Sequence, residues 1–141
     1  MNEKRLLKLA DHLETIKRKG KSIFHNDKDS PVTVMNKGEC GFNMDTWFDW
    51  DYEGCGTTAC ALGHACSIPS FRKAGLRMRS DPVDENYYYP DFNGMEGLEA
   101  ASEFFDIDFE GACSLFYSRG PETPKQVAKR IRKFVKTGDC T

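Results

Sequence analysis

The sequence predicts a mostly helical α+β domain, with five or six helices around a central apolar helix and a small antiparallel hairpin or sheet. Three observations predict this class. Apolar residues recur at helical spacing near both ends of the chain, residues 48–53 alternate between aromatic and acidic, and residues 59–66 are almost entirely apolar. The chain has 141 residues, 39% of them hydrophobic, which suffices for one core, so we expect a single domain over residues 1–141.

The first helix is expected near the N-terminus, where apolar residues recur three and four positions apart behind a capping residue, Asn2. Gly20 should end this helix. Residues 21–41 are polar and contain Ser30-Pro31, which predicts a long polar loop with no more than one brief strand, at the VTVM run. The buried stripe of the helix would consist of Leu6, Leu9, Ala10, Leu13 and Ile16.

The middle of the chain combines a strand signal with a helix signal. The alternation in residues 48–53 places aromatic side chains on one face and acidic ones on the other, as in a half-buried strand. Thr57 or Thr58 is expected to cap a helix that runs to Cys66. Only His64 is polar within it, so this helix should lie in the interior.

A short helix is predicted after Pro69, with Gly75 in the left-handed conformation that ends it. The segments LRMR and NYYYP, joined by the turn-rich SDPVDE, then predict a small hairpin. Two helical stripes follow, made of Met95, Leu98, Ala101, Phe104 and Phe105 and, further on, of Phe109, Ala112, Cys113 and Phe116.

The segment TPKQVAKRIRKFV is the most clearly marked helix of the chain. Thr123 is its expected N-cap, Pro124 stands at the first helical position, and Gln126 occupies the capping-box position. The buried face of this helix would be formed by Val127, Ile131, Phe134 and Val135.

The net charge of −2 hides an uneven distribution of charge. Residues 1–21 hold seven Lys and Arg against three acids, residues 119–141 hold seven against two, and the residues between hold six against seventeen. We interpret the basic ends as the solvated faces of amphipathic helices beside an acidic central surface. Nucleic acid is not an expected partner, because no aromatic side chains interleave with these cations to form a stacking platform.

No stretch approaches the roughly 20 apolar residues that a membrane span needs, and charges occupy the position where a secretory signal has its apolar region. We therefore expect a cytoplasmic protein without membrane contact. In that compartment the six cysteines should be reduced thiols and not a disulfide framework.

The segment CGTTACALGHAC, residues 55–66, contains the residues that bear reactive chemistry. Cys55 precedes the expected helix, whose N-terminal dipole favours a thiolate, so it is a candidate nucleophile with His25 or His64 as base. His64 would lie on the order of 10 Å further along the helix, which leaves the base unplaced. Cys60 and His64 are four residues apart and could offer two metal ligands, but further ligands are missing, so we expect neither a metal nor another cofactor.

A third possibility for the same segment is an anion site. The backbone amides and hydroxyl groups at the start of a helix can hold a phosphate or carboxylate, although a plain helix cap explains the same residues. The neighbouring aromatic rings would form the wall of a pocket. The predicted ligand-binding residues are Cys55, Gly56, Thr57, Thr58, Trp47, Trp50, Tyr87 and Tyr89.

The order of the segments FNMDTW, CGTTACALGHA, IPSFRKAGL, GLEAASEFFDI and TPKQVAKRIRKFV resembles a group of small bacterial and bacteriophage proteins without an established activity. The resemblance covers residues 42–135 and implies a stand-alone cytoplasmic protein encoded by a phage. In this group an aromatic residue can replace histidine at the position of His64, which argues against an obligatory role for that side chain. The matching motif positions are Cys55, Gly56, Thr57, Cys60, Gly63 and His64.

These observations favour a non-catalytic binding protein, a phage-type accessory factor that captures a small anionic, nucleotide-like ligand or antagonises a host protein. Two alternatives remain open. One is a cysteine-dependent hydrolase or transferase with Cys55 as its nucleophile. The other is a protein-directed inhibitor that uses its acidic strand and the YYYPDF segment as a contact surface. The oligomeric state is not indicated by any of these patterns.

Overall fold

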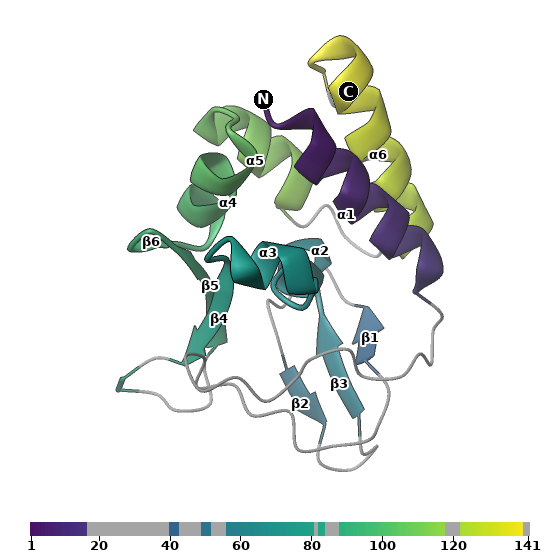
Figure 1. Cartoon of the computed structure of the whole chain (residues 1–141). Helices are drawn as coiled ribbons and strands as arrows, with labels where there is room; N and C mark the ends of the chain where they lie inside the picture. Colours follow the sequence, from purple (N-terminus) through teal and green to yellow (C-terminus); the bar gives the residue numbers. More distant parts are fainter. Residues whose placement is uncertain are drawn as a thin grey trace.

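The computed structural model describes residues 1–16, 40–42, 49–51, 56–80, 82–83, 88–117 and 122–139. Within these residues six helices accompany two small sheets, which confirms the mostly helical α+β class (Figure 1). The helices are α1 (Glu3–Thr15), α2 (Ala61–Ala65), α3 (Pro69–Lys73), α4 (Leu98–Phe105), α5 (Phe109–Phe116) and α6 (Pro124–Thr137). The strands are β1 (Cys40–Phe42), β2 (Asp49–Asp51), β3 (Gly56–Ala59), β4 (Arg77–Ser80), β5 (Tyr88–Phe92) and β6 (Met95–Glu96).

Helices α1 and α6 lie side by side, with the start of α1 and the end of α6 at the same end of the molecule (Figure 1). As predicted, Asn2 caps α1, because its side-chain oxygen accepts a hydrogen bond from the Arg5 amide at 3.1 Å. The helix ends at Thr15, and Ile16 is its C-cap in an extended conformation. The expectation that this helix runs to Gly20 is wrong, because Ile16 already leaves the helical conformation, and the VTVM run lies outside the described residues. The stripe that α1 buries consists of Leu6, Leu9, Ala10 and Leu13.

The two sheets differ in their pairing. In the first, β3 lies in the centre and pairs in parallel with β1 and in antiparallel with β2. Strand β1 includes Cys40 and Gly41, so the last two residues of the expected loop 21–41 belong to a sheet. The second sheet contains the predicted hairpin β4–β5, extended by β6, and all its neighbours are antiparallel. Gly75 has a φ of +110° just before β4, in the region that favours glycine.

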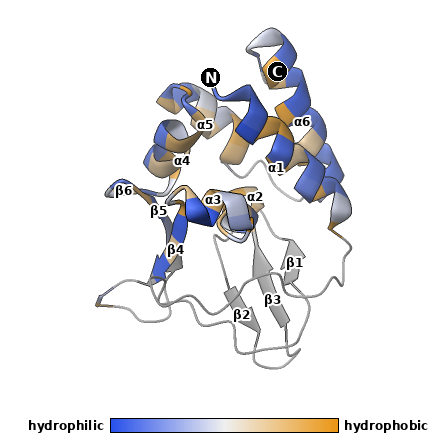
Figure 2. Ribbon diagram, in the orientation of Figure 1, coloured by the Kyte–Doolittle hydropathy of each residue, from blue (hydrophilic) through white to orange (hydrophobic). Residues whose placement is uncertain are grey.

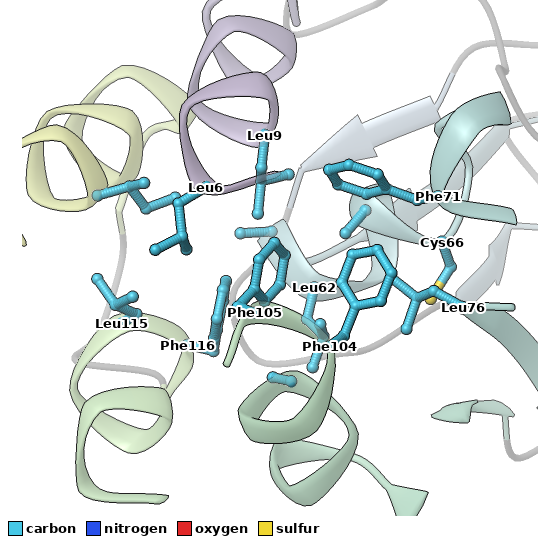
Figure 3. Close-up of a cluster of buried hydrophobic side chains, with 14 of the residues drawn as sticks. Leu6, Leu9, Leu62, Cys66, Phe71, Leu76, Phe104, Phe105, Leu115 and Phe116 are labelled. Carbon is cyan, nitrogen blue, oxygen red and sulfur yellow. The ribbon is translucent and has the colours of Figure 1, made fainter. Parts of the chain in front are cut away.

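The core lies between the helices and the β4–β5 hairpin. Every residue of α2 is buried, which confirms the prediction of an interior helix in this segment. Figure 3 shows the aromatic centre of the core, where Phe71 of α3 and Phe104 and Phe105 of α4 lie close together. The Phe104 ring centroid is 4.9 Å from that of Phe71, 5.1 Å from that of Phe92 and 5.0 Å from that of Phe105, each in an edge-to-face arrangement.

The first turn of α1 also closes the end of α4. The Asn2 amide donates to the Phe105 carbonyl at 2.7 Å, and the Arg5 guanidinium donates to the Phe104 carbonyl at 2.8 Å. The guanidinium carbon of Arg5 lies 4.1 Å from the centroid of the Phe104 ring. A helix C-terminus carries unpaired carbonyls and a partial negative charge, so this cation satisfies both.

Two expectations about helix faces are wrong. Met95 belongs to β6 and is 42% exposed, because Gly97, with a φ of +61°, separates it from α4. Phe109 is 53% exposed, since it occupies the first position of α5, where the helix extends beyond the core. Of the other residues of this stripe, Ala112 and Phe116 are buried as predicted, whereas Cys113 is only partly buried.

Candidate functional site

Capping residues define both ends of helix α6. The predicted capping box is present: the Thr123 hydroxyl accepts from the Gln126 amide at 3.2 Å, and the Gln126 side chain accepts from the Thr123 amide at 2.8 Å. Gly138 ends the helix with a φ of +72°. One face packs into the core through Val127, Ala128, Ile131 and Phe134. The opposite face of α6 is therefore exposed to solvent.

Helix α6 contains lysine and arginine but no acidic residue, and its two arginines are occupied by other parts of the fold. Arg130 forms an ion pair with Glu122 and donates to the Leu115 carbonyl at 3.0 Å, with its side chain only 10% exposed. Arg132 reaches across to α1 and pairs with Asp11 at 2.5 Å and Glu14 at 3.0 Å. These carboxylates raise the pKa of the Arg132 guanidinium through hydrogen bonds with Glu14 and Asp11.

The other four cations of α6 form what we call the lysine row. Its members are exposed, and they follow one another at intervals of four, four and three residues. At about 100° per residue these positions fall within an arc of about 80° on the helix surface. The lysine row consists of Lys125, Lys129, Lys133 and Lys136.

A hollow of about 500 Å³ lies along this side of α6. Cations dominate the described part of its wall, with Gln126 and Thr137 as polar neighbours that can donate or accept hydrogen bonds. The described lining residues are Gln126, Lys129, Arg130, Arg132, Lys133, Lys136 and Thr137. Figure 2 shows hydrophilic residues along much of α6. Such a surface attracts anions by charge and can bind phosphate oxygens through the lysine ammonium groups.

The helix-start site predicted between Cys55 and Thr58 is wrong in its geometry. Gly56, Thr57 and Thr58 belong to β3, the central strand of its sheet, so their backbone groups point toward β1 and β2. The helix begins later, at Ala61, and its N-cap is Cys60, whose sulfur accepts from the Gly63 amide at 3.4 Å.

The two aromatic residues of the predicted pocket wall that the structure describes belong to different sheets. Trp50 lies in β2 opposite Thr57, whereas Tyr89 lies in β5 of the other sheet and is half-buried. In the YYYPDF segment, Phe92 is buried in the core. Four predicted site residues lie outside the described residues: His25, Trp47, Cys55 and Tyr87.

Cys60 and His64, the candidate metal ligands, are both buried, at 1% exposure each. Burial raises the pKa of the Cys60 thiol to about 11, which disfavours the thiolate that a metal or a nucleophile needs. Within the part of the chain that the structure describes, no group of three or more His, Cys, Asp or Glu side chains could hold a metal ion. The ring of His64 instead lies 5.7 Å, between centroids, from that of His12 on α1.

The cysteine side chains that the structure describes are free thiols: Cys60, Cys66 and Cys113. Burial also raises the pKa of the Cys66 thiol. Among the described residues, none of the helices is long and apolar enough to cross a membrane.

The sequence predicts the basic helix, with its charges as a general solvated face. The four lysines could have been found by their spacing, which repeats the helical period on the side opposite the buried residues. Which cations are neutralised by Glu122, Asp11 and Glu14 depends on tertiary contacts and has no sequence signal. No family model matches the chain, and neither the search of curated proteins nor that of solved structures found a similar protein.

Proposed function

We propose that this is a non-catalytic binding protein that captures an anionic, phosphate-bearing ligand on the lysine row of α6. The observation that supports the proposal is the row itself: four exposed lysines on a helix without acidic residues, of which Lys129, Lys133 and Lys136 line a hollow of about 500 Å³. The proposal keeps the cytoplasmic accessory role that the resemblance to phage proteins implies. The proposed binding site lies on α6 and not in the Cys55 segment.

Coulomb energies set the strength expected for such a site. An exposed ion pair contributes about 0.2 to 1 kcal/mol, because water and salt screen it. The three lysines that line the hollow supply at most about 3 kcal/mol, which corresponds to a dissociation constant above about 1 mM, and hydrogen bonds from Gln126 and Thr137 would add to it. The proposal therefore predicts weak, salt-sensitive binding.

The alternative of a cysteine-dependent enzyme has Cys55 as its nucleophile and His25 or His64 as its base. Cys55 and His25 lie outside the described residues, and His64 is buried. A protein-directed inhibitor that contacts its partner through YYYPDF is disfavoured at Phe92, which is buried and not available for contact. We therefore place anion capture first.

Isothermal titration with tripolyphosphate tests the proposal. The double variant Lys129→Gln/Lys136→Gln should bind about tenfold more weakly than the unaltered protein in 20 mM salt, a loss of about 1.4 kcal/mol. The matched control is Lys4→Gln/Lys8→Gln, which removes the same charge from exposed positions on α1. Affinity in the control should change less than twofold. Equal losses in the two variants, or no heat of binding for the unaltered protein, would overturn the proposal.

A further inference from the structure

We infer that the lysine row binds the phosphate backbone of a nucleic-acid duplex without reading its sequence. The inference rests on the proposed function, because it uses the same lysines, and it specifies the class of anion. Three properties of α6 support it: the linear arrangement of the lysines, their rigid support and the chemistry of their neighbours.

The first property is length. Lys125 and Lys136 are eleven residues apart, so the row extends over about 17 Å along the helix axis at a rise of about 1.5 Å per residue. A single compact triphosphate cannot contact both ends of such a line. A duplex carries one phosphate about every 1.7 Å of its axis when both strands are counted, so about 17 Å of duplex holds about ten phosphates, and the four lysines can contact those on the near side. The charges of the row therefore suit an extended polyanion.

The second property is rigidity. The buried face of α6 and the contacts of Arg130 and Arg132 with neighbouring segments hold the helix against the rest of the fold, and the capping box at Thr123 stabilises its first turn. Only the lysine side chains have to be ordered when a polyanion binds, which keeps the entropic cost of association low. Because the arginines are engaged elsewhere, the row acts through point charges that tolerate small shifts of the phosphates.

The third property is what the row lacks. No aromatic side chain belongs to the lysine row or to the described wall of the hollow, so unstacked bases find no ring on which to stack. The lack of rings disfavours a single-stranded partner. A duplex, in contrast, keeps its bases stacked and offers its phosphates on the outside. The only uncharged polar side chains in the described wall are Gln126 and Thr137, which lie at the edge of the row. Contacts confined to phosphates carry no sequence information.

Fluorescence anisotropy with a labelled 20-base-pair duplex tests the inference, in a salt series from 50 to 200 mM. Four phosphate contacts predict a slope of log K against log salt of about −3.6, so the affinity should fall about 150-fold across the series. Lys129→Gln/Lys136→Gln should reduce the slope to about −1.8. The control Lys4→Gln/Lys8→Gln should leave it at the original value. All four altered positions are exposed, and a thermal melt of each variant checks that it is folded.

The possible outcomes separate the two proposals. If tripolyphosphate binds through the row and the duplex does not, the duplex inference is overturned and the proposed function stands. If neither binds, both fall. A labelled single strand of 20 nucleotides or poly-glutamate of equal length that binds as tightly as the duplex, through the same lysines, would also overturn the inference, in favour of a stacked strand or an acidic polypeptide.

Discussion

Replacing Glu122 by Gln should destabilise the protein by about 3 kcal/mol, whereas the same change at Glu14 should cost about 0.5 kcal/mol. Both carboxylates pair with an arginine of α6, but their surroundings differ. The side chains of Arg130 and Glu122 are 10% and 12% exposed, so Glu122→Gln leaves a guanidinium with little access to water. Breaking such a buried pair costs about 3 to 5 kcal/mol, and the lower value applies because the Leu115 carbonyl still accepts a hydrogen bond.

The exposed pair provides the comparison. Arg132 and Glu14 are 35% and 47% exposed, and Asp11 remains as a partner when Glu14 is changed. Urea denaturation of the two variants in 0.15 M salt measures both losses. In 1 M salt the loss at Glu14 should disappear, since charges are screened beyond about 3 Å, and the loss at Glu122 should persist. Equal losses at the two positions, or a loss at Glu122 that salt removes, would refute the reasoning from burial.

Three other outcomes are expected. Burial lowers the pKa of His12, so the folded state favours its neutral form; stability should be full above about pH 6.5 and decline as the pH falls, and a flat urea midpoint between pH 8 and pH 5 would contradict this. Iodoacetamide at pH 7.5 should label Cys60 and Cys66 slowly in the folded protein and rapidly in urea, because burial raises the pKa of both thiols; rapid labelling without urea would argue against it. Phe104→Leu should cost about 2 kcal/mol more than Phe116→Leu by thermal denaturation, since Phe104 has edge-to-face contacts with three rings and Phe116 stacks on Phe105; similar costs would count against the aromatic contribution.

The parts of the fold that sequence predicts well are those with local signals. Asn2 and Thr123 cap helices as expected, because an N-cap is recognised from the residue itself and its neighbours within one turn. Gly75 likewise takes the positive φ that its place after a short helix requires. For such helix ends, the residues within one helical turn largely determine the local structure.

The prediction that Thr57 or Thr58 caps a helix is wrong because non-local contacts decide the structure there. Threonine is a good N-cap and also a good strand residue, so the local pattern fits both structures. What decides is pairing with β1 and β2, whose residues lie up to 17 positions away in the sequence, as in the pairing of Cys40 with Thr57. The candidate site on α6 was missed for the same reason. Its lysines are visible in the sequence, but the ion pairs that engage Arg130 and Arg132 are tertiary contacts that the sequence does not show.

The packing of α1 against α6 has a consequence for synthesis on the ribosome. Helix α1 leaves the exit tunnel before α6, and it buries Leu6 and Leu9 in a core to which α6 contributes. Until α6 emerges, the leucine stripe of α1 lacks part of its cover, and chaperones that hold apolar segments have time to bind it. Fragments that end before α6 should therefore expose this stripe and aggregate.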